Sequence, residues 1–356
     1  MKRIILRFLI TAIAGIAGYL LFWPVPIDPA AWNPPAPDTS GIYAENNELA
    51  KIERLPINSP APEDIAIDSQ GRIYTGVLDG HIYRLQADGT RPEVFSHTYG
   101  RPLGLKFDQN GNLIVADAVK GLLSIGADGS ITVLSNQADG VPFQCTNDLD
   151  IAADGTIYFT DASYKFPLSA LKADLLEHRP NGRLLAYDPK TGKTRAVLRD
   201  LYFANGVAVS PDQSFLLVNE TGTYSVRRVW LNGDRRGQSE TFIENLPGFP
   251  DGISSNGNGL FWLALVNRRD AALDFLLRHP FLRKTVMRLP DFLQPAIKRY
   301  AFVLALDANG KVVQNLQDPS ANCFAEISNV VEYNGNLYFG SIGESAIGRI
   351  PLPVRK

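Results

Sequence analysis

The chain has 356 residues, of which 45% are hydrophobic and 20% are charged, a composition that predicts a globular protein with a large core. The formal net charge of −2 gives no indication of a nucleic-acid partner. Only two cysteines are present, Cys145 and Cys323, which excludes a disulfide-rich scaffold and a cysteine-ligated zinc cluster. The four histidines are not spaced as a metal-binding pair.

Residues 1–23 are predicted to form a transmembrane signal anchor. Lys2, Arg3 and Arg7 precede an unbroken apolar run that ends at Trp23. Counted from Ile4, the segment has 20 residues, about enough to span a bilayer at ~1.5 Å per residue. The basic residues precede the run, which orients the N-terminus toward the cytoplasm and the rest of the chain toward the periplasmic or extracytoplasmic side.

The alternative is a cleaved signal peptide, because Ala12-Ile13-Ala14 is similar to an A-x-A cleavage site. Cleavage there would leave the apolar stretch "GIAGYLLFW" as an exposed tail, so the uncleaved anchor is favoured. Residues 24–50 follow, are rich in proline, and show neither helix nor strand periodicity. They predict a semi-rigid tether.

Residues 51–356 contain a repeating unit of short strands separated by turns, which predicts an all-β fold, a six-bladed β-propeller. The first two strands of the six units are the clearest, and read "EDIAIDSQGRIYTG", "LGLKFDQNGNLIVAD", "NDLDIAADGTIYFTD", "NGVAVSPDQSFLLVNE", "DGISSNGNGLFWLAL" and "ISNVVEYNGNLYFGS". A fourth strand can be identified in only five units. Residues 51–57, "KIERLPI", are predicted to supply the sixth and close the ring, which removes the exposed sheet edges.

One position recurs when the six units are aligned on the turn residue that is usually glycine. Eight residues before that turn, at the start of each innermost strand, stand Glu63, Leu103, Asn147, Asn205, Asp251 and Ile327. The innermost strands of a propeller line its central channel, so these side chains should converge at one mouth of the channel. Four of the six carry oxygen.

The oxygen-bearing residues predict a calcium site. Any one of them has an ordinary explanation, since Asn and Asp side chains often bond nearby backbone. Four at one register, with no basic residue there, would be costly without a cation, and oxygen ligands suit calcium. Asp64 follows Glu63 and Asp148 follows Asn147. These two either form a second, deeper cation site or hydrogen-bond neighbouring backbone.

Two insertions, residues 164–182 and 267–300, fall between the second and third strands of their units, on the mouth side, and predict short helical lids. The second is amphipathic, and it contains more basic residues than its three acids. The basic residues are Arg268, Arg269, Arg278, Arg283, Lys284, Arg288, Lys298 and Arg299. It is either a membrane-facing or substrate-gating lid, or a cap packed on the propeller with a solvated basic face.

Two further predictions concern the mouth. Asp117, Asp161 and Asn219 stand at the mouth ends of second strands and could form an outer rim of the pocket. Cys145 and Cys323 precede inner strands of opposite blades, so two free thiols are favoured over a disulfide.

The sequence resembles the strictosidine synthase-like family, through motifs that include "NDLDIAADGTIYFTDAS", "LYFANGVAVSPDQSFLLVNET" and "NLPGFPDGI". The wider group includes gluconolactonases and paraoxonases, whose hydrolytic members bind a catalytic calcium through Glu, Asn, Asn and Asp. That resemblance implies the same role for Glu63, Asn147, Asn205 and Asp251, and a structural calcium near Asp64 and Asp148.

The sequence also departs from these relatives. Gly252 replaces a second asparagine of the paraoxonases, and Leu103 stands in place of their base histidine. Where strictosidine synthase has its catalytic glutamate, the alignment places Ser328, with Glu326 two positions away. Condensation of the strictosidine type is therefore not predicted.

Two hypotheses follow. In the first, the protein is a membrane-anchored, calcium-dependent hydrolase of small-molecule esters or lactones, similar to arylesterases and lactonases. Asp251 or a calcium-bound water then acts as base or nucleophile, and Asn147 supports both metal binding and rate. In the second, the protein is a non-catalytic binding or scaffold propeller that calcium stabilises.

Overall fold

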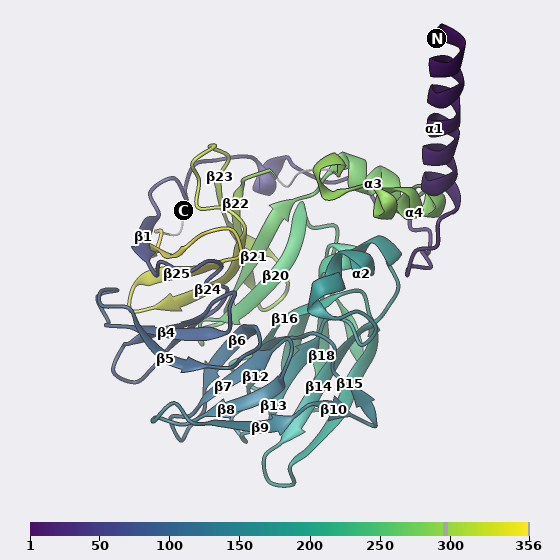
Figure 1. The fold of residues 1–356 in the computed structure, drawn as a ribbon. Coiled ribbons are helices and arrows are strands. Elements are labelled where there is room, and N and C mark those ends of the chain that lie inside the picture. The colour runs from purple at the N-terminus through teal and green to yellow at the C-terminus, as the bar shows by residue number, and fades with distance from the viewer. Residues whose placement is uncertain (295–297, 355–356) are drawn as a thin grey trace.

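The protein is a six-bladed β-propeller with an N-terminal helix that stands away from it (Figure 1). The structure, a computed structural model, describes residues 1–294 and 298–354. Each blade is a four-stranded antiparallel sheet, which confirms the predicted fold class.

The blades follow one another in chain order. Blade 1 consists of β2 (Ile65–Ile67), β3 (Ile73–Gly76), β4 (His81–Leu85) and β5 (Glu93–His97). Blade 2 consists of β6 (Pro102–Phe107), β7 (Leu113–Asp117), β8 (Gly121–Ile125) and β9 (Ile131–Ser135). A small hairpin, β10 (Gln137–Ala138) and β11 (Val141–Pro142), leads to blade 3, which consists of β12 (Thr146–Ile151), β13 (Ile157–Asp161), β14 (Gly182–Asp188) and β15 (Lys193–Leu201).

The remaining blades repeat this order. Blade 4 consists of β16 (Ala204–Val209), β17 (Phe215–Glu220), β18 (Ser225–Trp230) and β19 (Ser239–Ile243). Blade 5 consists of β20 (Gly248–Ser255), β21 (Leu260–Arg268), β22 (Ala301–Asp307) and β23 (Val312–Asp318). Blade 6 consists of β24 (Ile327–Tyr333), β25 (Asn336–Ser341), β26 (Ala346–Pro351) and β1 (Glu53–Pro56).

The ring is closed by strands from the two ends of the chain. β1 pairs antiparallel with β26, with Glu53 opposite Arg349 and Pro56 opposite Ala346. The strand at residues 53–56 therefore completes blade 6, and this sheet cannot separate from the rest of the ring without breaking that pairing.

The hydrophobic core lies between neighbouring blades. Phe261 and Phe302 of blade 5, at 0% and 1% exposed, pack against Leu217 of blade 4. A sheet covered on both faces needs apolar residues on both, and accordingly every residue of β17 is buried. Separate hydrophobic clusters between the blades thus hold the inner strands around the channel.

The described helices are α1 (Lys2–Phe22), α2 (Leu171–Glu177), α3 (Ala271–Leu277) and α4 (Pro280–Arg288), with short 3-10 turns η1 (Gly41–Tyr43), η2 (Leu168–Ala170), η3 (Thr221–Thr223) and η4 (Asp291–Leu293). α2 to α4 lie within the predicted insertions. Residues 295–297 of the second insertion lie outside the described residues. Within the described part of the chain, α1 is the one helix long and apolar enough to cross a membrane.

Candidate functional site

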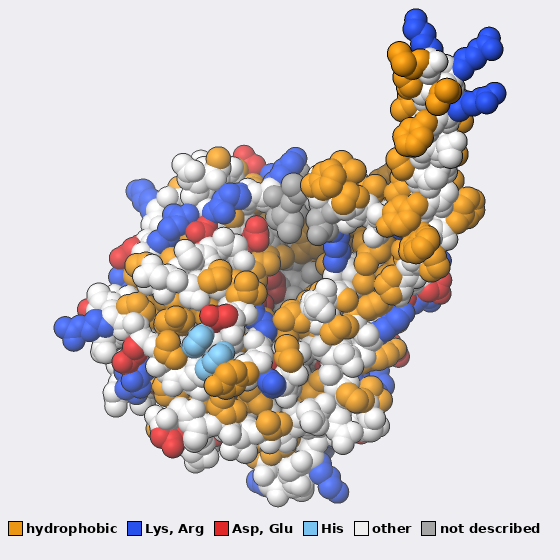
Figure 2. Space-filling model, in the orientation of Figure 1, with side chains coloured by type: hydrophobic (Ala, Val, Ile, Leu, Met, Phe, Trp, Pro, Cys, Tyr) orange, Lys and Arg blue, Asp and Glu red, His pale blue; other side chains and the backbone are white. Residues whose placement is uncertain are grey.

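The oxygen-bearing residues at the starts of the inner strands line one small cavity. Every blade contributes to its wall, which is formed by Glu63, Asp64, Leu103, Asn147, Asp148, Asn205, Asp251, Gly252, Ser328 and Asn329. The structure therefore brings together the four predicted calcium ligands and the two acids that follow them. Figure 2 shows a hollow on this face of the molecule, beside the lid.

Irregularities in the inner strands explain how consecutive residues line the same cavity. The pairing register shifts between Thr146 and Leu149 in β12, and between Pro250 and Ile253 in β20. β6, β16 and β24 show the same shift near their starts. A regular strand would send adjacent side chains to opposite faces, whereas a β-bulge re-aims them. As a result, Asn147 and Asp148 both face the channel.

The sixth blade departs from the predicted register by one residue. Ile327 is fully buried in the core, and Ser328 and Asn329 line the cavity instead. The reason is a two-residue turn at Asn334 and Gly335, both at positive φ, because Tyr333 pairs directly with Asn336. A fixed step of eight residues from the turn glycine therefore misplaces this strand.

Asp64 and Asp148 hydrogen-bond backbone on two neighbouring blades. Asp64 accepts from its own neighbour Ile65 and from Leu105 of blade 2, each at 2.6 Å. Asp148 accepts from Leu149 at 2.8 Å and from Val207 of blade 4 at 2.9 Å. Each carboxylate thus links two inner strands, which is the backbone role that the sequence analysis left open.

Burial disfavours ionisation of these two carboxyl groups. It raises the pKa of Asp64 to about 7. It also raises the pKa of Asp148 well above its usual value, with the charge of Asp64 as a second cause. Lys106, which pairs with Asp150 at 3.0 Å, opposes the rise in the pKa of Asp64. Additional positive charge in the cavity would further favour the ionised form of both groups.

Glu63 has a cationic partner that the sequence analysis missed. Arg101 forms an ion pair with Glu63 and donates to the Ala61 carbonyl at 2.9 Å. Arg101 is only 4% exposed, and it stands two positions before Leu103, outside the register that was compared. Burial raises the pKa of Glu63, and Arg101 opposes that rise.

Asp251 has no such cation. Burial raises its pKa well above the usual value, the charge of Glu63 adds to the rise, and a hydrogen bond from Asn205 opposes it. The Asn147 amide lines the cavity, and no hydrogen bond to it is present within the described residues. Asp251 and Asn147 are therefore the two groups of the site with the most unused hydrogen-bonding capacity.

The donor set fits a hard cation. Four carboxyl groups, three amides and one hydroxyl surround the cavity, with no sulfur or imidazole among them. The described residues contain no group of three or more His, Cys, Asp and Glu side chains arranged to hold a metal. The fit therefore depends on the amide oxygens of Asn147 and Asn205 acting beside Glu63 and Asp251.

The predicted outer rim is wrong. Asp117, Asp161 and Asn219 are all 0% exposed. Asp161 forms an ion pair with Arg183, and Asn219 donates to the Asp251 carbonyl at 2.5 Å. These side chains fix the strand ends beneath the mouth because they bond backbone and buried charge. Cys145 and Cys323 are buried free thiols.

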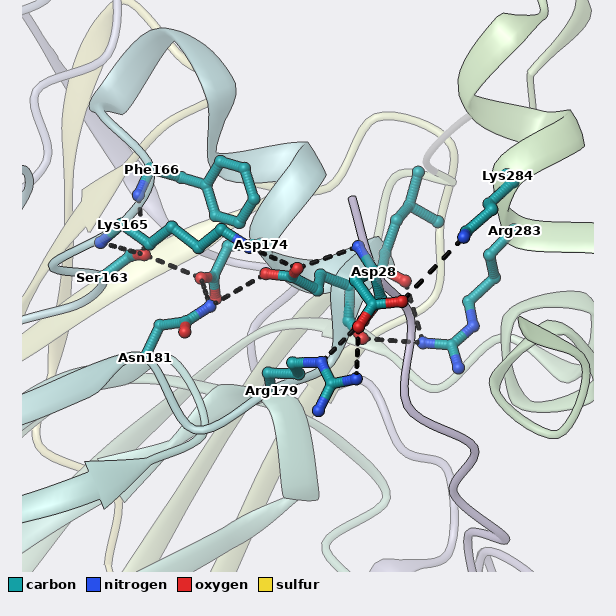
Figure 3. A network of polar contacts seen from close by, with 11 residues as sticks. Asp28, Ser163, Lys165, Phe166, Asp174, Arg179, Asn181, Arg283 and Lys284 are labelled. Carbon is teal, nitrogen blue, oxygen red and sulfur yellow. Dashed lines mark hydrogen bonds and ion pairs between the residues drawn. The ribbon is translucent and has the colours of Figure 1, made fainter. Parts of the chain in front are cut away.

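A buried polar network holds the first lid in place (Figure 3). Asp174 of α2 accepts from Ser163 at 2.7 Å and from Asn181 at 2.9 Å. Glu177, fully buried at the end of α2, pairs with Lys165. Burial raises the pKa of Asp174 to about 6. Both ends of the first insertion are thereby fixed to α2.

The N-terminal connection packs on the lids and is not a free spacer. We call residues 24–37 the strap. The backbone amide of Ala30 donates to the Glu177 carbonyl, and that of Trp32 donates to the Leu277 carbonyl, each at 3.0 Å. The Asp28 amide donates to Glu177 at 2.9 Å, and the Asp28 carboxylate pairs with Arg179 at 2.7 Å, as Figure 3 shows. The strap therefore joins α2 to the second lid.

Comparisons with known proteins agree with the architecture. A family model described as strictosidine synthase matches residues 147–234, and one described as strictosidine synthase-like, N-terminal, matches residues 41–85. Strictosidine synthase-like protein 6 of Arabidopsis thaliana is 40% identical over 299 residues, covering 82% of this chain and 79% of that protein. Adipocyte plasma membrane-associated protein of Rattus norvegicus is 32% identical over 373 residues, covering 98% and 99%.

Solved structures share the fold at lower identity. A gluconolactonase from Xanthomonas campestris superposes with a TM-score of 0.62 at 20% identity, covering 92% of this chain and 98% of that one. The calcium-binding protein regucalcin from Agrobacterium tumefaciens gives a TM-score of 0.60 at 15% identity, covering 83% and 92%.

The inner strands approach so closely that a methyl group should disturb them. A Cβ added at Gly206 would lie 2.5 Å from the Asp251 carbonyl oxygen. We expect Gly206→Ala to reduce the free energy of unfolding by about 1–3 kcal/mol. The control is Gly126→Ala, whose nearest neighbours are the side-chain ends of Asp128 and Ser130. Urea denaturation that shows equal losses for both variants would contradict the close approach.

His178, beneath the strap, should make stability depend on pH. It stacks on Trp32 with ring centroids 4.8 Å apart, and burial lowers its pKa to about 4 from a usual 6.5. As the pH falls through this window, the unfolded chain takes up a proton that the folded protein does not, so stability is lost.

We therefore expect the stability advantage of the natural chain over His178→Asn to shrink between pH 6.5 and pH 4. Asparagine tolerates the left-handed φ of 51° at this position. His279→Asn, at an exposed histidine, is the control. A pH-independent difference between the natural chain and His178→Asn, measured by denaturation at several pH values, would show that His178 is not buried as a neutral ring.

Proposed function

We propose a function for this chain, which belongs to the strictosidine synthase-like family. The proposed function is hydrolysis of ester or lactone bonds in small molecules, by a membrane-anchored propeller whose cavity holds calcium. The observation that carries the proposal is the group of four buried carboxyl groups around one cavity. Arg101 pairs with Glu63, and Lys106 lies close enough to interact with Asp64 and Asp148, whereas Asp251 has no basic partner among the described residues.

The structural neighbours support this choice of chemistry. One is described as a gluconolactonase and another as a calcium-binding protein, and both have the same propeller fold. Glu63, Asn147, Asn205 and Asp251 would hold the cation, and Asp64 and Asp148 line the same cavity. When bound, calcium would polarise the carbonyl oxygen of the substrate.

Asp251 is the proposed general base. Its carboxylate accepts a proton from the attacking water while the water oxygen bonds to the substrate carbonyl carbon. The ester or lactone C–O bond then breaks, and the departing oxygen takes up the proton that Asp251 releases. Asn205 orients Asp251 through its hydrogen bond, and Asn219 fixes the Asp251 backbone. The proposed reaction consumes one water and needs no other co-reactant.

The condensation that gives the family its name is not part of the proposal. The Ser328 hydroxyl donates to the Glu63 carbonyl oxygen at 2.6 Å, so it links blade 6 to blade 1. Gly252, where paraoxonases add a ligand, approaches the Ser328 carbonyl so closely that an added Cβ would lie 2.5 Å from it. The backbone therefore leaves no room for a side chain at that position.

A second function is favoured by a different observation. Arg101 satisfies Glu63, and backbone amides satisfy Asp64 and Asp148. These three acids have protein partners, which suits a binding or scaffold propeller whose cation only stabilises the fold.

Membrane anchoring by α1 is part of the proposal. No residue of α1 is buried, and the adipocyte plasma membrane-associated protein aligns over 98% of this chain. We expect membrane fractions to hold the full-length protein, with protease added outside the cytoplasm digesting the propeller. A propeller protected inside the cytoplasm, or a mature chain that begins near residue 15, would contradict this topology.

Calcium should stabilise the folded protein by mass action, by about 2.7 kcal/mol at a hundredfold excess over the dissociation constant. We expect the melting temperature to fall on chelation and to recover with calcium. Glu63→Gln and Asp251→Asn should reduce this response, whereas Asp234→Asn, at an exposed turn residue, should not. Metal-stripped protein that melts identically at all calcium concentrations would exclude the site.

Turnover of an aryl acetate and of an aliphatic lactone separates the two functions. We expect modest hydrolysis that is lost on chelation, a loss of at least about a hundredfold in Asp251→Asn because the base is removed, and a weaker rate together with weaker calcium binding in Asn147→Ala. A folded, calcium-stabilised protein that hydrolyses neither substrate would favour the scaffold function.

A further inference from the structure

We propose that the second lid, formed by α3, α4 and η4, is a docking surface for the lipid bilayer that α1 enters, and that it lies among the lipid headgroups. This inference rests on the proposed anchor. It concerns a separate surface, which neither the fold nor the cavity requires to contact lipid.

The first observation is that α4 is tied to the last turn of α1. The Arg288 guanidinium donates to the Trp23 carbonyl at 2.6 Å and to the Leu20 carbonyl at 2.8 Å. The Tyr19 hydroxyl donates to the Arg288 carbonyl at 3.3 Å. Carbonyls in the last turn of a helix lack partners within the helix, so Arg288 serves as their cap.

This tie sets the depth of the lid. The apolar segment from Ile4 to Trp23 is just long enough to cross the hydrocarbon core, of roughly 30 Å. Its last turn must then lie at the bilayer surface, where aromatic residues such as Tyr19 and Trp23 are favoured. Because Arg288 contacts that turn directly, α4 lies at the same level.

The second observation is the apolar surface of the lid. Four large hydrophobic side chains are more than half exposed, namely Phe275 (53%), Phe281 (54%), Phe292 (83%) and Leu293 (58%). They come from α3, α4 and η4, one after another along the chain. Figure 2 shows hydrophobic side chains gathered over α3 and continuing along α1. Contiguous apolar surface of this kind marks a protein or membrane contact.

The basic residues of the lid mostly serve another purpose. Arg283 donates to backbone carbonyls of Leu176 and of the strap, and Arg269 donates to the Pro35 carbonyl of the strap. Arg278 and Lys298 are exposed, and neither has an ion pair within the described residues. The lid therefore packs on the rest of the protein through its basic residues and presents apolar side chains to its outer surface. This surface suits the bilayer rather than a charged ligand.

Depth measurements on the full-length chain test this proposal. Single cysteines at Phe281→Cys and Phe292→Cys would carry a nitroxide label, since Cys145 and Cys323 are 0% and 2% exposed and should not react. The protein is reconstituted in vesicles of phosphatidylcholine with a minor fraction of phosphatidylserine. Collision of the label with oxygen is compared with collision with a water-soluble nickel chelate.

Two controls separate the lid from the anchor. Ile13→Cys places a label in the middle of α1, and Val133→Cys, at a residue 56% exposed on β9, places one on the propeller. We expect both lid labels to favour oxygen several-fold more than the Val133 label does, and to lie shallower than the Ile13 label. Lid labels as accessible to the nickel chelate as the Val133 label, with the Ile13 label in lipid, would overturn the docking surface alone. An Ile13 label in water would overturn the anchor and the docking surface together.

Discussion

The close approach of six inner strands around one channel is the constraint on which the rest of the structure depends. Gly104, Gly206 and Gly252 stand where a methyl group would meet the backbone of the next blade. At this distance, backbone amides of one strand need acceptors from its neighbour. Asp64 and Asp148 supply them, which gathers carboxyl groups around the channel. Burial disfavours their ionisation, and a bound cation would favour it.

The distribution of that charge distinguishes structural acids from reactive ones. Glu63 has Arg101 as its partner, and Asp64 and Asp148 accept backbone hydrogen bonds. Asp251 has only the Asn205 amide. A carboxylate held by one neutral donor is the one most able to bind a cation or accept a proton. This is why Asp251 is the proposed base, and why the other three acids are also compatible with a purely structural site.

Much of this could be predicted from the sequence, because repeats report their register directly. Counting back eight residues from the turn position identified the cavity-lining residue correctly in five of the six blades. It failed at Ile327, since turn length is a local property that a shorter hairpin changes. Arg101 was missed because it reaches Glu63 from a position outside the compared register. The strap was predicted as a tether because proline-rich segments lack periodicity whether or not they pack, and its contacts come mainly from lid residues far away in the chain.

The strap, the lids and α1 form one connected unit. Arg288 fixes the end of α1 to α4, and Arg283 fixes α4 to the strap and to α2. Glu177 of α2 accepts a hydrogen bond from the Asp28 backbone amide of the strap. Each link is a hydrogen bond to a backbone group or a buried charge, so it holds direction as well as distance. A lid joined in this way cannot adopt an arbitrary orientation toward the bilayer. If α1 spans the membrane, these contacts also restrict how the propeller faces the lipid surface, because the lids are insertions between β13 and β14 and between β21 and β22.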